Sequence, residues 1–177
     1  MLFRKIESFI KNWLQSDNNK ILVIDGARQI GKSYIIRKCG QELFENYIEL
    51  NFVEDKQDKH LFQNVNSIDD FYFILSTIFG NKMKNKKNTL IFLDEIQEYP
   101  HIITLLKFLK KDDKFTYIAS GSLLGITLAD TSSIPIGSIE IKRMDEVERR
   151  LRFFMFARHG RALTGVSPEH AQVVGNV

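Results

Sequence analysis

The sequence predicts an α/β fold in which helices cover both faces of a parallel five-stranded sheet. Short runs of consecutive apolar residues alternate along the chain with longer segments whose apolar residues recur at helical spacing. A strand that is apolar at every position is buried on both faces, which is typical of parallel sheets. The 177 residues are 44% hydrophobic and 27% charged, as in ordinary globular proteins, so the chain can bury a substantial core.

The individual elements follow from the same two patterns. Apolar residues gather on one face of the predicted helices, over 2–14, 32–44, 68–79 and 101–109. Continuous apolar or alternating runs predict strands over 21–24, 47–52, 90–93, 115–119 and 139–141. The aromatic run 71–75 resembles a docking patch, but its helical spacing favours a place in the core.

The strongest motif directly follows the first predicted strand. It matches the P-loop pattern in full and consists of Gly26, Ala27, Arg28, Gln29, Ile30, Gly31, Lys32 and Ser33. Its glycines allow successive backbone N–H groups to surround phosphates, and the start of the next helix adds its positive dipole end. Lys32 is expected to reach the β- and γ-phosphates, and Ser33 to ligate Mg²⁺. The alternative is a glycine-rich turn with an exposed lysine.

A second motif follows the third predicted strand, where the apolar residues 90–93 lead into Asp94 and Glu95. This Walker B arrangement brings Asp94 to the carboxyl edge of the sheet, where ligands bind in open α/β folds. We expect Asp94 to hold Mg²⁺ and Glu95 to polarise the water that attacks the γ-phosphate. Without the P-loop, the same residues would indicate only a strand that ends in two solvated acids.

Three stretches in this order, GARQIGKS, IFLDEIQEYP and YIASGSLLGI, resemble prokaryotic AAA-type P-loop ATPases that carry a nuclease-like C-terminal domain. The resemblance covers about residues 2–143, and its most particular feature is the run from Asp94 to Gln97 followed by Pro100. It implies a three-layer P-loop NTPase core with strand order 5-1-4-3-2, and it implies that the nucleotide is ATP.

The resemblance also implies roles for three further polar residues. Ser120 and Ser122 match the family's sensor segment, in which a hydroxyl contacts the γ-phosphate or the attacking water. Asn51, at the end of the second predicted strand, is expected to hydrogen-bond Glu95 and hold it inactive. The residues alone leave simpler alternatives, because Ser and Asn are common in turns.

The chain departs from this family after the fifth predicted strand. No helical lid is recognisable beyond Arg143, and every lysine lies at or before Lys142, whereas the last part is rich in Arg, Ala, Gly and Val. We therefore expect a truncated ATPase core over 1–145 and a helical tail of different composition over 146–177. Turnover is expected to be weak unless a second copy supplies an arginine finger, such as Arg28 or Arg143, in trans.

Charge and cysteine content narrow the function classes. The net charge of +3 is too small to imply nucleic acid. A basic loop of Lys82, Lys84, Lys86 and Lys87 could contact DNA, although a solvated loop is the simpler interpretation. The single Cys39 excludes an internal disulfide framework and a cysteine-rich zinc site. With no secretory signal and no apolar run long enough for a membrane span, we expect a cytoplasmic protein without a membrane partner.

The function that the sequence predicts is Mg-ATP binding with weak ATP hydrolysis. One alternative is a nucleotide-gated module that binds DNA or protein with little turnover, and phosphate release would distinguish it from an ATPase. A second alternative is a P-loop small-molecule kinase, in which Lys32 and Ser33 would serve equally well. Glu95 beside Asp94 favours activation of water over transfer to a substrate hydroxyl.

Overall fold

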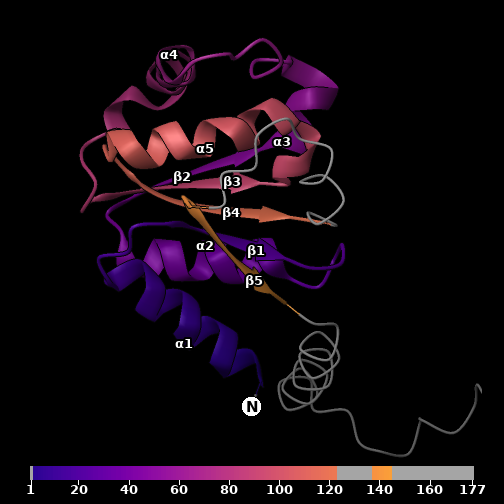
Figure 1. The fold of residues 1–177 in the computed structure, drawn as a ribbon, viewed down its shortest axis with the longest axis vertical. Helices are drawn as coiled ribbons and strands as arrows, with labels where there is room; N and C mark the ends of the chain where they lie inside the picture. The colour runs from indigo at the N-terminus through magenta and orange to yellow at the C-terminus, as the bar shows by residue number, and fades with distance from the viewer. Residues whose placement is uncertain (1, 123–136, 145–177) are drawn as a thin grey trace, which may run out of the picture.

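The five strands form one parallel sheet in the computed structural model (Figure 1). The structure describes residues 2–122 and 137–144. The strands are β1 (Ile21–Asp25), β2 (Asn46–Asn51), β3 (Thr89–Asp94), β4 (Thr116–Gly121) and β5 (Ile139–Arg143). Their order is β2-β3-β4-β1-β5 with every pair parallel, which is the predicted order read from the opposite edge. The predicted fold class and topology are confirmed.

Helices lie on both sides of this sheet. On one side are α1 (Leu2–Gln15) and α2 (Lys32–Leu43), and on the other are α4 (Ile68–Phe79) and α5 (Pro100–Asp112) (Figure 1). Among the described helices, none is long and apolar enough to cross a lipid bilayer. The tail expected over 146–177 lies outside the described residues.

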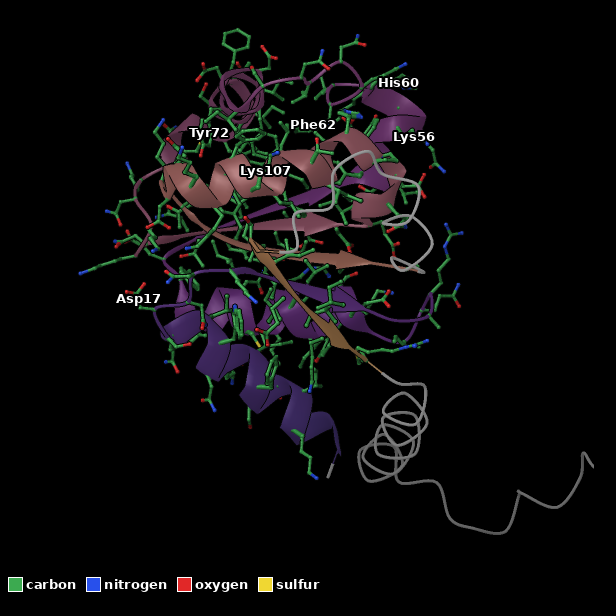
Figure 2. The ribbon with its side chains drawn as sticks, in the orientation of Figure 1. Asp17, Lys56, His60, Phe62, Tyr72 and Lys107 are labelled. Carbon is green, nitrogen blue, oxygen red and sulfur yellow. The ribbon has the colours of Figure 1, made fainter. Side chains whose placement is uncertain are left out.

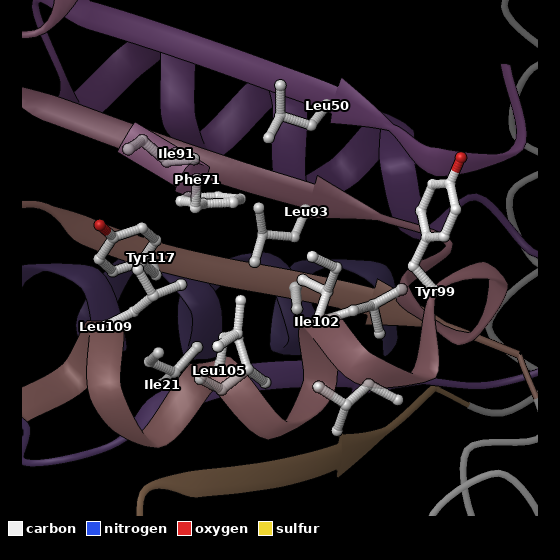
Figure 3. Close-up of a cluster of buried hydrophobic side chains, with 14 of the residues drawn as sticks. Ile21, Leu50, Phe71, Ile91, Leu93, Tyr99, Ile102, Leu105, Leu109 and Tyr117 are labelled. Atoms are coloured by element: carbon white, nitrogen blue, oxygen red, sulfur yellow. The ribbon is translucent and has the colours of Figure 1, made fainter. Parts of the chain in front are cut away.

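Successive residues of the central strands enter two separate halves of the core. In β3, Ile91 and Leu93 pack with side chains of α4 and α5, such as Phe71 (Figure 3). Leu90 and Phe92 of the same strand point to the other half, beside α1 and α2. Side chains alternate across a strand, so a strand between two helical layers needs apolar residues at every position. The continuous apolar runs of the sequence reflect this double burial.

Local signals set the ends of the helices over the first half of the core. A capping box starts α4: Ser67 and Asp70 each accept the other's backbone N–H. Pro100 occupies the first turn of α5, and Asp113 with φ 55° follows its end. The prediction for α4 therefore agrees with the structure, whereas α5 is longer at both ends than the predicted 101–109.

The connection after β2 differs from the prediction. The predicted strand included Phe52, but β2 ends at Asn51, and a short helix α3 (Phe52–Glu54) follows. The side-chain oxygen of Asn51 accepts the backbone N–H groups of Val53 and Glu54 and so caps this helix. The polar cap ends the strand although the apolar pattern continues.

Asp55 organises the rest of this connection. It begins the π-helical turn η1 (Asp55–Lys59), and it is 8% exposed. Its carboxylate accepts the N–H groups of Leu61 and Phe62, both at 3.2 Å, and the hydroxyl of Tyr99 at 2.9 Å. These bonds hold the segment around Phe62 (Figure 2) against the start of α5. The connection after β2 is therefore tied to the segment between β3 and α5.

The aromatic run on α4 divides between core and surface. Phe71 and Leu75 are fully buried, whereas Phe73 is 72% exposed. The prediction of a core segment is thus correct for the face that carries Phe71. Phe73 lies on the opposite face because two residues correspond to about 200° around a helix.

This contrast yields a paired test. Replacing Phe71 by Ala is expected to reduce the free energy of unfolding by about 3–5 kcal/mol, because it leaves a cavity in the core. Replacing the exposed Phe73 by Ala should change it by less than about 0.5 kcal/mol. Urea denaturation of both variants measures the difference, and equal effects would contradict the placement of α4.

Candidate nucleotide-binding site

The loop between β1 and α2 turns sharply at two glycines at the carboxyl edge of the sheet. Gly31 has φ 93°, in the left-handed region that favours glycine. A Cβ on Gly26 would lie 2.5 Å from both the Met144 carbonyl oxygen and Ile30 Cδ1. Met144 approaches closely because its N–H donates to the Asp25 carbonyl at 2.7 Å. The loop can therefore pass beside the end of β5 only with glycine at position 26.

Lys32 places its ammonium group inside this loop. The residue is 3% exposed, and Nζ donates to the carbonyls of Gly26 and Ala27, both at 2.9 Å, and to the Ser122 hydroxyl at 3.2 Å. Burial lowers the pKa of Lys32, while the neighbouring carboxylate of Glu95 opposes that shift. The Lys32 ammonium is therefore a buried positive charge with three oxygen acceptors around it.

Asp94 joins three secondary-structure elements at the same edge. It ends β3 and is 4% exposed. Its Oδ1 accepts hydrogen bonds from the Ser33 hydroxyl on α2, at 3.0 Å, and from the Ser120 hydroxyl on β4. Burial raises the pKa of Asp94, and the two hydroxyl hydrogen bonds oppose the shift. The carboxylate and the hydroxyls form a compact group of oxygen atoms.

Glu95 has a left-handed backbone, with φ 54° and ψ 49°. Its Oε2 accepts hydrogen bonds from Gln97 Nε2 at 2.5 Å and from the Ser122 hydroxyl at 3.2 Å. Gln97 Oε1 in turn accepts the backbone N–H of Ser122 at 3.1 Å. A non-glycine residue in this conformation is strained by about 1–3 kcal/mol, and such residues concentrate at functional sites.

The other side chains of the predicted P-loop lie outside this cluster. Arg28 has a side chain that is 71% exposed, and its guanidinium lies 3.5 Å from a Glu98 carboxylate oxygen. Ile30 is 2% exposed and packs into the core on the α2 side. Gln29 has φ 62°. Lys32 and Ser33 are therefore the side chains of this motif that contact the ends of β3 and β4.

The structure brings together Lys32, Ser33, Asp94, Glu95, Ser120 and Ser122, and the roles given to them from the sequence stay predictions. The prediction for Asn51 is wrong, because its side chain caps α3 and also donates to Glu54 at 2.9 Å. Glu95 is held by Gln97 instead. In the sequence, Gln97 stood out only as part of the run from Asp94 to Gln97, although an amide two residues after a glutamate was a usable signal.

The parallel sheet, the glycine-bearing loop before α2 and the acidic pair after β3 together define a P-loop nucleotide-binding protein. The profile described as AAA domain matches residues 18–155. The chain belongs to this AAA family and contains an ATP-binding P-loop module. No curated protein sequence matches the chain.

Solved structures agree with this fold. DnaA from Aquifex aeolicus bound to AMPPCP aligns with a TM-score of 0.55 and 16% identity, over 89% of this chain and 50% of that one. C. elegans PCH-2 aligns with a TM-score of 0.52 and 13% identity, over 94% of this chain and 50% of that one. Aeropyrum pernix ORC1 in complex with DNA aligns with a TM-score of 0.56 and 13% identity, over 89% of this chain and 48% of that one. The chain thus spans about half the length of these proteins, and the likeness concerns the fold.

The crowding at Gly26 gives a matched glycine test. Replacing Gly26 by Ala is expected to destabilise the fold by about 1–3 kcal/mol and to weaken nucleotide binding, because the new Cβ would overlap the Met144 carbonyl. Gly80 is the control: among the described residues other than its chain neighbours, no atom lies within 4 Å of a Cβ there, so Gly80→Ala should leave both properties unchanged. Thermal unfolding and binding calorimetry measure the two effects. An unchanged Gly26→Ala variant would contradict the described loop.

Proposed function

We propose that this chain binds Mg-ATP at the loop from Gly26 to Ser33 and hydrolyses it slowly. The observation that carries this proposal is the convergence at one sheet edge of the buried Lys32 amine, the Asp94 carboxylate and Glu95. These groups come from different elements and supply a cation for phosphate, oxygens for a metal and a base for water.

Phosphate binding would use the loop backbone and Lys32. The N–H groups of Ala27, Arg28, Gln29, Ile30 and Gly31 form the turn that enters α2, whose N-terminus carries a partial positive charge. Lys32 would exchange its bonds to the loop carbonyls for bonds to the β- and γ-phosphates. Its lowered pKa indicates an ammonium poorly solvated in the free site, which a polyanion stabilises.

Ser33 and Asp94 fit a Mg²⁺ site. Mg²⁺ prefers carboxylate, hydroxyl, water and phosphate oxygens, and these two side chains already lie within a 3.0 Å hydrogen bond. When bound with ATP, the ion would neutralise charge on the β- and γ-phosphates. Ser120 would hold Asp94 in place through its own hydrogen bond.

Hydrolysis would use Glu95 as the general base. As a water oxygen attacks the γ-phosphorus, Glu95 accepts a water proton and the bond to the β-phosphate oxygen breaks, which gives ADP and phosphate. Ser122, whose hydroxyl lies 3.2 Å from both Lys32 Nζ and Glu95 Oε2, is the proposed sensor of the γ-phosphate. A kinase remains the less favoured alternative because the base lies beside the metal ligand.

Slow turnover and self-association are part of the same proposal. Arg28 and Arg143 are exposed, so either could serve as an arginine finger in the site of a second copy. We assign the nucleotide site to a core over 1–145, because all the proposed contacts fall between Gly26 and Ser122. The family match continues to residue 155.

A nucleotide-gated DNA-binding module is the second candidate function. Lys82, Lys84 and Lys87 are exposed, and within the described part of the chain no carboxylate pairs with their ammonium groups. Lys86 differs, because it lies 2.7 Å from Asp113. The structural neighbour ORC1 is in complex with DNA, which gives this candidate limited support.

Two substitutions separate binding from chemistry. Lys32→Ala should abolish Mg-ATP binding, because it removes the charge that faces the phosphates. Glu95→Gln should bind ATP as tightly as the original protein and lower phosphate release by about 10²-fold or more, because an amide cannot accept the proton. Calorimetry and steady-state phosphate release measure these effects. Unchanged binding by the first variant would contradict the nucleotide site, and unchanged turnover by the second would contradict the base.

The basic loop can be tested with paired and unpaired lysines. Any DNA binding should be weak and salt-sensitive, and the double change Lys84→Gln with Lys87→Gln should reduce the slope of log affinity against log salt by about 2. Lys86→Gln should reduce it less, because Asp113 already neutralises that charge. Titration of a labelled duplex at several salt concentrations measures the slope. An unchanged slope in the double variant would contradict a contact between this loop and DNA, and tight binding that persists in high salt would contradict the predicted weak binding.

A further inference from the structure

We propose that Gln97 is the positioning residue for Glu95: it anchors one carboxylate oxygen so that the other is left to accept the proton of the attacking water. This inference rests on the ATP hydrolysis proposed above. It assigns a role to the one polar side chain of the run 94–97 that the proposed function leaves unused.

The Gln97 side chain bridges the ends of two neighbouring strands. Gln97 lies in the short helix η3 (Ile96–Glu98), which Glu95 alone separates from the end of β3. Its Nε2 donates to Glu95 Oε2 at 2.5 Å, and its Oε1 accepts the Ser122 N–H at 3.1 Å, just beyond the end of β4. A primary amide can donate and accept at once, so one side chain satisfies both partners.

The hydrogen bonds on Glu95 are unevenly distributed over its two oxygens. Oε2 accepts from Gln97 and from the Ser122 hydroxyl, at 2.5 and 3.2 Å. Within the described residues, Oε1 accepts no hydrogen bond. A general base needs a free lone pair directed at the proton that it removes. The arrangement therefore distinguishes a held oxygen from a reactive one.

The backbone of this segment is fixed independently of Gln97. Ile96 is 1% exposed and packs into the core between the two polar residues. Glu95 therefore keeps its place, and only rotation about its side-chain bonds can move the carboxylate. Removing the amide should release this rotation, and small displacements of a catalytic group reduce rates by up to about 10²-fold.

Two variants separate positioning from support of the Ser122 segment. Gln97→Met keeps the side-chain length and removes both hydrogen bonds. Gln97→Glu keeps an acceptor for the Ser122 N–H, but it replaces the donor to Glu95 by a second carboxyl group, and two carboxyl groups in contact repel each other or share a proton. We expect both variants to lower kcat by about ten- to a hundredfold while the Kd for ATP changes by less than about twofold. A role limited to holding Ser122 would make Gln97→Met lower turnover by the same factor in a Glu95→Gln background as in the original protein.

A double-mutant cycle identifies the group through which Gln97 acts. In a Glu95→Gln background, adding Gln97→Met should change turnover by less than about twofold, because the base that it positions is already lost. Hydrogen exchange at the Ser122 amide gives a readout independent of turnover. Its protection should fall in Gln97→Met and persist in Gln97→Glu.

Each outcome assigns success or failure to a separate claim. The inference is overturned if both Gln97 variants turn over ATP like the original protein while Glu95→Gln does not. Faster turnover by either variant would also overturn it, because Gln97 would then restrain Glu95. If Glu95→Gln itself turns over as fast as the original protein, the proposed base is wrong, and the inference fails with it.

Discussion

The architecture of the site depends on the hydrogen bonds that satisfy the buried carboxylate of Asp94. A carboxylate removed from water is destabilised by several kcal/mol unless hydrogen bonds replace its hydration. Here Ser33 from α2 and Ser120 from β4 donate to the same oxygen. Satisfying this one group therefore sets the first turn of α2 beside the ends of β3 and β4. Asp94 and the loop that precedes α2 are adjacent for the same reason.

The charges of Lys32 and Glu95 at this edge of the sheet are also satisfied by hydrogen bonds. The Lys32 ammonium is surrounded by loop carbonyls and the Ser122 hydroxyl, and that hydroxyl also contacts Glu95. The Lys32 ammonium and the Glu95 carboxylate, the proposed base, are thus connected through one serine just beyond the end of β4. Because neither charge is fully solvated, a phosphate that displaces the carbonyls from Lys32 would act on the whole group of residues.

Asn51 and Gln97 illustrate how local bonds compete with long-range ones. Asn51 is aligned with Asp94 across the β2–β3 pair, so its position allowed the predicted contact with Glu95. Its side chain instead binds the backbone of the next residues, as short polar side chains commonly do at helix starts. Gln97 has one more methylene group, which lets its amide span from Glu95 to Ser122.

The sequence by itself determined the sheet, its helical layers and the residue types of the site, because double burial and the P-loop spacing leave a direct mark on the amino-acid pattern. Only the tertiary structure decided which polar partners meet. The bridge from Glu95 to Ser122 depends on the distance between segments far apart in the chain. The face of α4 that carries Phe71 rather than Phe73 is buried because that face meets the core cluster of α5 and the sheet. Hydrogen-bond partners are chosen by such distances within a few tenths of an ångström, and no periodicity in a sequence records them.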